Sequence, residues 1–524
     1  MKSRKWQLIS AAIAAMAFAA CSDSWDAALD GFGDSGVDGL GTGGSTASSG
    51  GSSGLPPEEE LEESFRSPVV AGPFVFSANS ESNRVARIDA RNLQIEVFDG
   101  GNGPTFLASL PAGETGGGVL VANERSHDAS LFVFPKGSDV EAADPDILTA
   151  LVPLQAGASA WTVGRSGKVA ISWSRASDNL LGSEDGYQDV TVLSFSGASV
   201  DDGIQFESAS LSVVFRPSRI EIAPDEKRAF VVSDPGITVL SFESGAHVER
   251  EIFLPDATLG LSRDVSFDAN GRYAFVRLEG ESEILIVDLD TDDRVSVELP
   301  GVVTDLDLSS DGETGVAVVR GDDAGIGEGG AGSAGSSLIA LFSLEALVAD
   351  AEDFEIVTID GLVGSASLSP DGKRAVLYTN ATPSSELWIL DVETKEKRSV
   401  DVRAPLRSAL VSPTGDHAVT IQQPPTGSTK AGAFAVVPLR ENLPTRIEGT
   451  DAPPSLVSLS PDGKSVLVTT LAPVGNISAS YLVQLPGFRV DRLELPSRPL
   501  SSGIVMSARR AFVAQEHPEG RISF

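Results

Sequence analysis

Ser369-Pro370-Asp371-Gly372-Lys373 occurs a second time, letter for letter, as Ser460-Pro461-Asp462-Gly463-Lys464. Weaker copies of the same turn recur along most of the chain at intervals of roughly 40 to 60 residues. Periods of this length are typical of stacked supersecondary units. The repeat therefore predicts how the chain folds, and it says little about what the chain binds.

The unit around the first copy shows the plan of the repeat. We expect strands over residues 365–368, 374–379, 386–391 and 398–402, each with apolar residues at alternate or adjacent positions. The Asp-Gly pair closes a tight hairpin, because Gly accepts a positive φ and Asp can bond its own backbone. Four antiparallel strands per unit predict one blade of an all-β propeller.

Aligning the chain on this turn gives about ten units, and the first of them begins at its second strand. The last unit ends at the start of its third strand, so the chain could be truncated at the C-terminus, or N-terminal strands could complete the last blade. Because propellers usually have about four to eight blades, we expect one large ring, two rings, or a ring plus degenerate units. The aligned turn positions are Gly72, Gly117, Gly167, Glu226, Gly271, Gly312, Gly372, Gly415, Gly463 and Arg509.

These residues carry a family resemblance that spans about residues 74–524. The Ser-Pro-Asp-Gly-Lys turn followed by Leu387-Trp388-Ile389-Leu390-Asp391 resembles the TolB-type propeller repeat. Residues 74–79 and 84–89, followed by Gly103-Pro104, resemble the YVTN repeat of surface and periplasmic propellers. The resemblance implies the fold, whereas the functions of such propellers range from binding scaffolds to lactonases and lyases.

Charge and cysteine content exclude several classes of function. The chain has 39 basic and 74 acidic residues, a formal net charge of −35, which would repel the phosphates of nucleic acids and anionic membrane surfaces. Its one cysteine, Cys21, excludes an internal disulfide and a thiol metal cluster. We expect no cofactor and no nucleic-acid partner.

Residues 1–20 have the composition of a signal peptide, with a basic start and a short apolar stretch. The ending before Cys21 resembles a bacterial lipobox, although Phe18 stands where that motif usually has Leu. The resemblance implies lipidation of Cys21, and Ser22 after it implies sorting to the outer membrane. The alternative is ordinary cleavage after Ala19, which would leave a free thiol.

The composition divides the mature chain into two regions. Residues 21–71 are rich in Gly, Ser, Asp and Glu, including the acidic run at residues 58–63, and we expect a flexible linker because so little apolar surface could be buried. Residues 72–524 form the predicted propeller domain.

Candidate ligand-binding residues lie on the predicted first strands, which should line the channel. Arg219, Arg263 and Arg407 stand near the start of that strand in three units, so they could hold a small anion. Alternatively, they are neutralised by carboxylates on the same strands, because an unpaired buried Arg is costly. Those carboxylates belong to Glu221, Asp264, Asp305 and Asp307.

Other motifs are weaker. Residues 288–292 carry alternate aspartates but lack the Gly and Glu of an EF-hand, so we interpret them as the turn before an outer strand. His127 and His517 occupy corresponding loops of two units, without metal-ligand spacing. Two insertions, residues 174–188 and 321–337, separate second from third strands and could project from one face.

The sequence favours a non-enzymatic, lipid-anchored envelope propeller that presents its faces to a protein, peptide or glycan partner, in the periplasm or at the cell surface. No nucleophile and base, metal cluster or dinucleotide loop is recognisable in the sequence. The alternative is a propeller enzyme of lactonase or lyase type, acting on an anionic or lactone substrate in the channel mouth.

Overall fold

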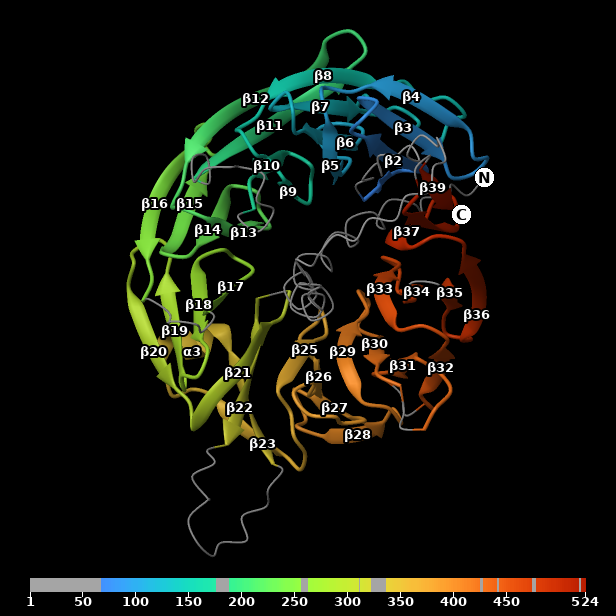
Figure 1. Ribbon diagram of the computed structural model, residues 1–524. Coiled ribbons are helices and arrows are strands. Elements are labelled where there is room, and N and C mark those ends of the chain that lie inside the picture. The colour runs from blue at the N-terminus through green and yellow to red at the C-terminus, as the bar shows by residue number, and fades with distance from the viewer. Residues whose placement is uncertain are drawn as a thin grey trace, which may run out of the picture.

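The computed structural model describes residues 67–524, except 176–187, 256–262, 311, 322–335, 425–426, 441–442, 474–476 and 518–519. Along this part of the chain, ten antiparallel sheets follow one another around a common centre (Figure 1). Nine of these sheets have four strands and the last has three. The predicted all-β propeller is confirmed, and its units form one large ring.

Each blade uses its strands in chain order from the centre of the ring outward. The first strands are β1 (Val69–Ala71), β5 (Pro104–Leu110), β9 (Ala160–Val163), β13 (Pro217–Ile222), β17 (Arg263–Phe267), β21 (Gly301–Leu308), β25 (Ser365–Leu368), β29 (Leu406–Val411), β33 (Pro454–Leu459) and β37 (Pro499–Val505). The second strands are β2 (Phe74–Asn79), β6 (Gly118–Asn123), β10 (Val169–Trp173), β14 (Arg228–Ser233), β18 (Tyr273–Leu278), β22 (Thr314–Gly321), β26 (Arg374–Tyr378), β30 (His417–Gln422), β34 (Ser465–Thr470) and β38 (Arg510–Gln515).

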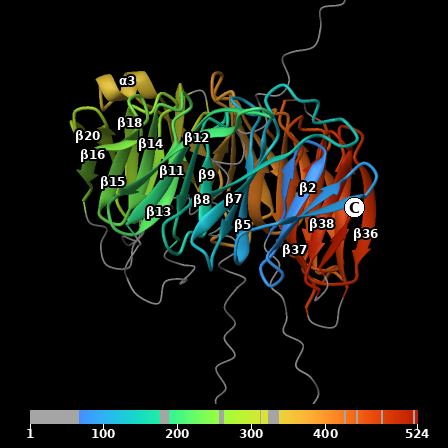
Figure 2. The same cartoon turned by 90° about the horizontal axis from the view of Figure 1, so that it is seen from above.

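The third strands are β3 (Arg84–Asp89), β7 (Asp128–Val133), β11 (Asp189–Ser199), β15 (Gly236–Ser241), β19 (Glu283–Asp288), β23 (Ser337–Ser343), β27 (Glu386–Asp391), β31 (Gly432–Pro438), β35 (Ser478–Gln484) and β39 (Arg521–Ser523). The fourth strands are β4 (Ile95–Asp99), β8 (Leu148–Pro153), β12 (Gly203–Ser212), β16 (His247–Phe253), β20 (Arg294–Glu298), β24 (Glu355–Ile359), β28 (Lys397–Asp401), β32 (Arg446–Thr450) and β36 (Arg489–Leu495). The helix α3 (Leu344–Ala349) lies between the third and fourth strands of the sixth blade and stands above one face of the disc (Figure 2).

The turn between the first and second strands has the geometry that the sequence predicts. All ten aligned positions have φ between 51° and 88°, including the two that are not Gly, Glu226 and Arg509. In the Ser-Pro-Asp-Gly-Lys copies, the serine is a further determinant of the turn. Ser369 Oγ donates to Asp371 Oδ1 at 2.7 Å and accepts the Arg374 N–H at 2.9 Å, so this buried side chain holds both ends of the hairpin together.

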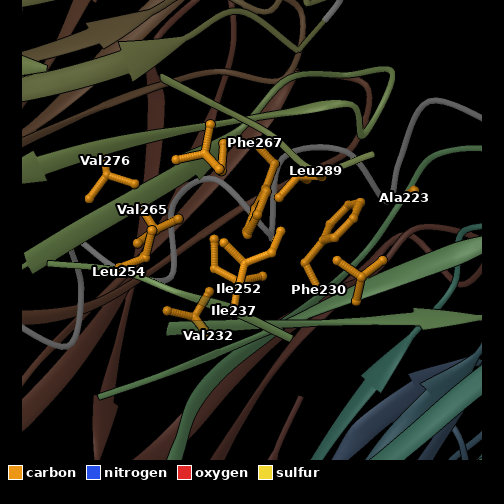
Figure 3. Close-up of a cluster of buried hydrophobic side chains, with 13 residues drawn as sticks. Ala223, Phe230, Val232, Ile237, Ile252, Leu254, Val265, Phe267, Val276 and Leu289 are labelled. Atoms are coloured by element: carbon orange, nitrogen blue, oxygen red, sulfur yellow. The ribbon is translucent and has the colours of Figure 1, made fainter. Parts of the chain in front are cut away.

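Apolar side chains from facing sheets pack between adjacent blades. Between the fourth and fifth blades, Phe230 stacks on Phe267 with ring centroids 4.6 Å apart, and Val232, Ile252 and Leu289 are buried around them (Figure 3). Burial of this apolar surface is the main force that holds one blade against the next.

The ring closes through side-chain packing between the last and first blades. Val505 and Phe512 of the tenth blade form one buried cluster with Val75 and Ile88 of the first. The expectation that the first unit begins at its second strand was wrong, because β1 pairs with β2 and lies just before the predicted domain start at residue 72. Three residues are too few to give a readable alternation of apolar and polar positions.

Candidate functional site

The first strands of the blades surround the centre of the ring (Figure 1). In the fourth to eighth blades these strands are β13, β17, β21, β25 and β29. Charged side chains are concentrated on four of them, β13, β17, β21 and β29, and each of these residues keeps partial exposure to solvent. They are Arg219, Glu221, Arg263, Asp264, Asp305, Asp307 and Arg407. This stretch of the channel wall is the candidate site.

Asp305 and Asp307 connect the sixth blade to the seventh. Because they are two residues apart on β21, their side chains leave the same face of the strand. Asp305 Oδ2 accepts the N–H of Ala366 at 2.8 Å, and Asp307 Oδ2 accepts the N–H of Leu368 at 2.6 Å. Ala366 and Leu368 lie on β25, the edge strand of the next sheet. The two carboxyls therefore satisfy backbone donors that would otherwise lack a strand partner.

The surroundings of this pair favour the neutral carboxyl. The pKa of Asp307 is raised to about 7, mainly by burial; the Leu368 N–H acts in the opposite direction, and the nearby Asp305 charge contributes to the increase. Burial also raises the pKa of Asp305 to about 6, while the Ala366 N–H and the Arg277 charge act in the opposite direction. Titration near neutral pH is a property that general acids and bases share, although structural carboxyls can have it too.

Two of the three predicted arginines bond to backbone carbonyls of neighbouring blades. On β13, Arg219 donates to the Val265 carbonyl of the fifth blade and lies 3.9 Å from the Glu221 carboxylate. On β17, Arg263 donates to the carbonyls of Ser233 at 2.8 Å and Pro255 at 3.0 Å. The predicted pairing with Glu221 is confirmed for Arg219, and both side chains also join blades together.

Arg407 lies three blades beyond Arg263, on β29 in the eighth blade. Figure 1 shows β13 and β17 on one side of the centre and β29 on the other. Burial lowers the pKa of Arg407. Its own carbonyl accepts the Asn380 side-chain amide at 3.2 Å, which is another bond between adjacent blades.

The aspartates at residues 288–292 form the turn between β19 and β20, as predicted. Asp288 Oδ1 accepts the N–H groups of Asp290 at 2.8 Å and Thr291 at 3.1 Å, while Oδ2 accepts Arg272. Asp391 has the same role in the seventh blade, where Oδ1 accepts the Thr394 N–H at 2.9 Å. Within the described ranges, no three His, Cys, Asp or Glu side chains are arranged to hold a metal ion.

The remaining sequence candidates are separated or lie outside the described residues. His127 lies between β6 and β7 in the second blade, and His517 follows β38 in the tenth, with the first blade between them. Cys21, the signal peptide and most of the linker precede residue 67, and most of both insertions falls in residues 176–187 and 322–335. No helix in the described part of the chain has the length and apolar character of a membrane span.

Sequence reasoning assigned Asp305 and Asp307 only as counterions for the arginines. Their bonds to β25 were missed because they depend on how two blades meet, which the pattern within one blade does not contain. The signal that could have indicated them is the Asp-x-Asp spacing on a strand that faces the centre.

Comparison with protein-family models and with curated proteins gives no match for this chain. Among solved structures, it is similar to the dihydro-heme d1 dehydrogenase NirN in complex with DHE, at 14% identity over 76% of each chain, with a TM-score of 0.39. It is also similar to a eukaryotic initiation factor, at 11% identity over 83% of this chain and 96% of that one, with a TM-score of 0.48. A third is the Swd1 β-propeller domain of Myceliophteria thermophila, at 12% identity over 57% and 92% of the two chains, with a TM-score of 0.34. Similarity at this level says nothing about ligand or activity.

Proposed function

We propose that this chain is an exported, lipid-anchored envelope protein whose propeller is a binding platform for a protein, peptide or glycan. The observation that carries the proposal is the difference between the two faces of the ring. The repeated turns interlock on one face, whereas the strand ends that flank the two predicted insertions, residues 174–188 and 321–337, lie at the other face, between second and third strands. Rigid scaffolds with variable loops on one face are a common form of binding protein.

Interlocking of the turns is visible at the glycines. A Cβ atom on Gly463 in the ninth blade would lie 2.5 Å from Thr414 Oγ1 of the eighth, and one on Gly312 would lie 2.6 Å from Ala269 Cβ of the fifth. A partner at this face would meet closely packed backbone. The insertion face is therefore where we place the partner.

The platform is tested by photocrosslinking in cells. A photoreactive side chain is placed at exposed positions Thr382 or Glu281 on the insertion face, and at Lys373 or Lys464 on the turn face as matched controls. We expect one discrete crosslinked species from the insertion-face positions and none from the turn face. Crosslinking from the turn face alone would contradict the assignment of the binding face.

The lipid anchor is supported by the basic start, the short apolar stretch and the single cysteine at position 21. Metabolic labelling of the full chain with a fatty acid tests it. We expect label on the wild-type chain, none on Cys21→Ala, and recovery of the wild type with the outer membrane. Label that persists in Cys21→Ala would exclude lipidation at this residue.

A second candidate function, a channel enzyme of lactonase or lyase type, is favoured by one observation. The Asp307 carboxyl is partly exposed, and burial raises its pKa to about 7, near the value suited to a general base. Hydrolysis of lactones by the purified chain, lost in Asp307→Asn without loss of folding, would support this candidate. Equal rates in both proteins would remove Asp307 from any such mechanism.

A further inference from the structure

The tenth blade has a free outer edge among the described residues. Its sheet has the order β37-β38-β39, whereas each of the other nine blades has a fourth strand outside the third. The free edge belongs to β39, which pairs with β38 from Arg521 to Ser523. An unpaired edge strand is a template for another strand.

The first blade leaves an apolar surface uncovered next to this edge. On β4, Glu96 and Phe98 face the second blade, because Phe98 lies 5.5 Å from Phe132 there. By the alternation of a strand, Ile95 and Val97 face the opposite way, toward the tenth blade. Ile95 is directly opposite Ile88 on β3, and Ile88 packs against the tenth blade.

Ile95 and Val97 are 65% and 50% exposed. Where the adjacent blade has a fourth strand, that strand can cover the corresponding surface. Between the second and third blades, for example, Leu148 and Ala150 of β8 belong to one apolar cluster with Ile204 and Phe206 of β12. The exposure of Ile95 and Val97 thus coincides with the place where a fourth strand of the tenth blade would lie.

The local charge differs from that of the chain. Residues 498–524 contain four arginines, at positions 498, 509, 510 and 521, against two glutamates, at 516 and 519, in a chain whose net charge is −35. Arg84 on β3 is directly opposite Asp99 and forms an ion pair with it at 3.3 Å, so both share the face of Ile95 and Val97; the Arg84 side chain keeps 53% exposure. The uncovered place therefore suits an acidic strand with apolar residues at alternate positions.

We propose that residues 60–66 of this chain occupy the uncovered place beside β39. They would form the fourth strand of the tenth blade, antiparallel to β39. The segment Glu60-Leu61-Glu62-Glu63-Ser64-Phe65-Arg66 is acidic, and its period of two places Leu61 and Phe65 on one face, where they would cover Ile95 and Val97. Its position in the chain also fits. Fourth strands lead directly to the first strand of the next blade, and β20 reaches β21 through residues 299–300 alone. A strand ending at residue 66 would reach β1 through residues 67–68.

This docking has a consequence for the tether. It fixes the chain at the outer rim between the tenth and first blades, so that only the residues before about position 60 act as a flexible linker. The ring closes by hydrogen bonds between strands as well as by the packing of Val505 and Phe512.

Thiol accessibility at Val97 tests the proposal in the full mature chain carrying Cys21→Ala. Val97→Cys is compared with Val200→Cys, which is 65% exposed in the hairpin between β11 and β12 of the third blade. We expect a maleimide to react with Val97→Cys at least about tenfold more slowly, because reaction requires local opening of the docked strand. Reaction at the rate of Val200→Cys would overturn the proposal.

A disruptive variant and a dilution series identify the occupant. Leu61→Asp with Phe65→Asp should raise the rate of maleimide reaction at Val97→Cys to that of Val200→Cys. Leu55→Asp, a matched change upstream of the segment, should leave the reaction at Val97→Cys slow. Slow reaction that persists in Leu61→Asp with Phe65→Asp would overturn the assignment. Protection that disappears on dilution would show that a second copy covers the surface, and would also overturn it. The first measurement needs no disruptive variant, so the proposal stays testable if that variant does not fold.

Discussion

Two substitutions of Asp307 distinguish the contribution of its charge to stability from that of its hydrogen bond. Asp307→Asn keeps an oxygen that can accept the Leu368 N–H, now 2.6 Å from Asp307 Oδ2, and removes the titrating group. Asp307→Ala removes both. Because leaving a buried N–H without a partner costs about 1–3 kcal/mol, we expect Asp307→Ala to be less stable than Asp307→Asn by about that amount at every pH.

The pH dependence has a definite sign. Burial raises the pKa of Asp307 from 3.8 to about 7, so the folded chain holds this proton over a range where the unfolded chain has lost it. Unfolding then releases a proton, and stability falls as pH rises from about 4 to about 7 and levels off above it. A pKa change from 3.8 to about 7 corresponds to at most about 4 kcal/mol of folding free energy, and partial exposure of the side chain reduces this contribution to about 1–3 kcal/mol. Asp305, with a pKa raised to about 6, acts in the same direction.

Urea unfolding of the wild type, Asp307→Asn and Asp307→Ala at about pH 5 and about pH 8 measures both effects. From about pH 5 to about pH 8, we expect the free energy of unfolding of Asp307→Asn to rise by about 1–3 kcal/mol relative to that of the wild type. The comparison cancels the titration of the many other carboxylates. Parallel changes in the two proteins would refute the argument that the fold disfavours the ionised carboxyl, and equal stability of Asp307→Asn and Asp307→Ala would refute the bond to β25.

Three further perturbations test the packing, the turn and the ligand hypothesis. Phe267→Ala removes the ring stacked on Phe230 between the fourth and fifth blades. Urea unfolding should show a decrease of about 3–5 kcal/mol in the free energy of unfolding. A decrease below about 1 kcal/mol would mean that this interface contributes little to stability. Gly463→Ala, at φ 66°, should lower the free energy of unfolding by about 1–2 kcal/mol, and Arg509→Gly, at φ 51°, should raise it by up to about that amount. Thermal unfolding measures both changes, and changes of the opposite sign would contradict the account of the turn. If Arg263 and Arg407 hold a small anion, organic anions should raise the melting temperature of the wild type more than that of the chain carrying Arg263→Ala and Arg407→Ala; equal responses would remove the hypothesis.

The fold was predictable because its determinants are local and repeated. The positive φ at each aligned turn follows from the residues of that turn, so one clear copy at residues 369–373 was enough to align weaker ones such as that at Glu226. Strand boundaries in the seventh blade were predicted within about one residue of β25 to β28, since apolar alternation and turn signals agree there. The three-residue strand β1 was missed because it is too short to carry such a pattern.

The candidate site was less predictable because it depends on contacts between blades. The sequence placed Arg219, Arg263 and Arg407 on first strands, which is where they lie. It could not show that Arg219 reaches the Val265 carbonyl or that Arg263 reaches the Ser233 carbonyl, because these bonds depend on the angle and distance between neighbouring sheets. A charged residue on a channel strand can serve a ligand or the adjacent blade, and residue type alone does not distinguish the two roles.

The same dependence on neighbouring blades explains why the two faces of the ring differ. At the turn face, the Gly of one blade packs against the turn of the blade before it: a Cβ on Gly271 would lie 3.2 Å from Ala223 Cβ, and one on Gly372 would lie 3.2 Å from Ser309 Cβ. An added residue in such a turn would separate two blades and expose their apolar interface. Between second and third strands the contact from one blade to the next is made by exposed side chains, as where Arg125 pairs with Glu81, and such contacts are more easily rearranged. The one helix of the described residues, α3, is consistent with this reasoning, because it lies on the turn side but between the outer strands β23 and β24. Sequence can therefore vary most freely at the insertion face, and that is where a partner would find the features that distinguish this ring from other propellers.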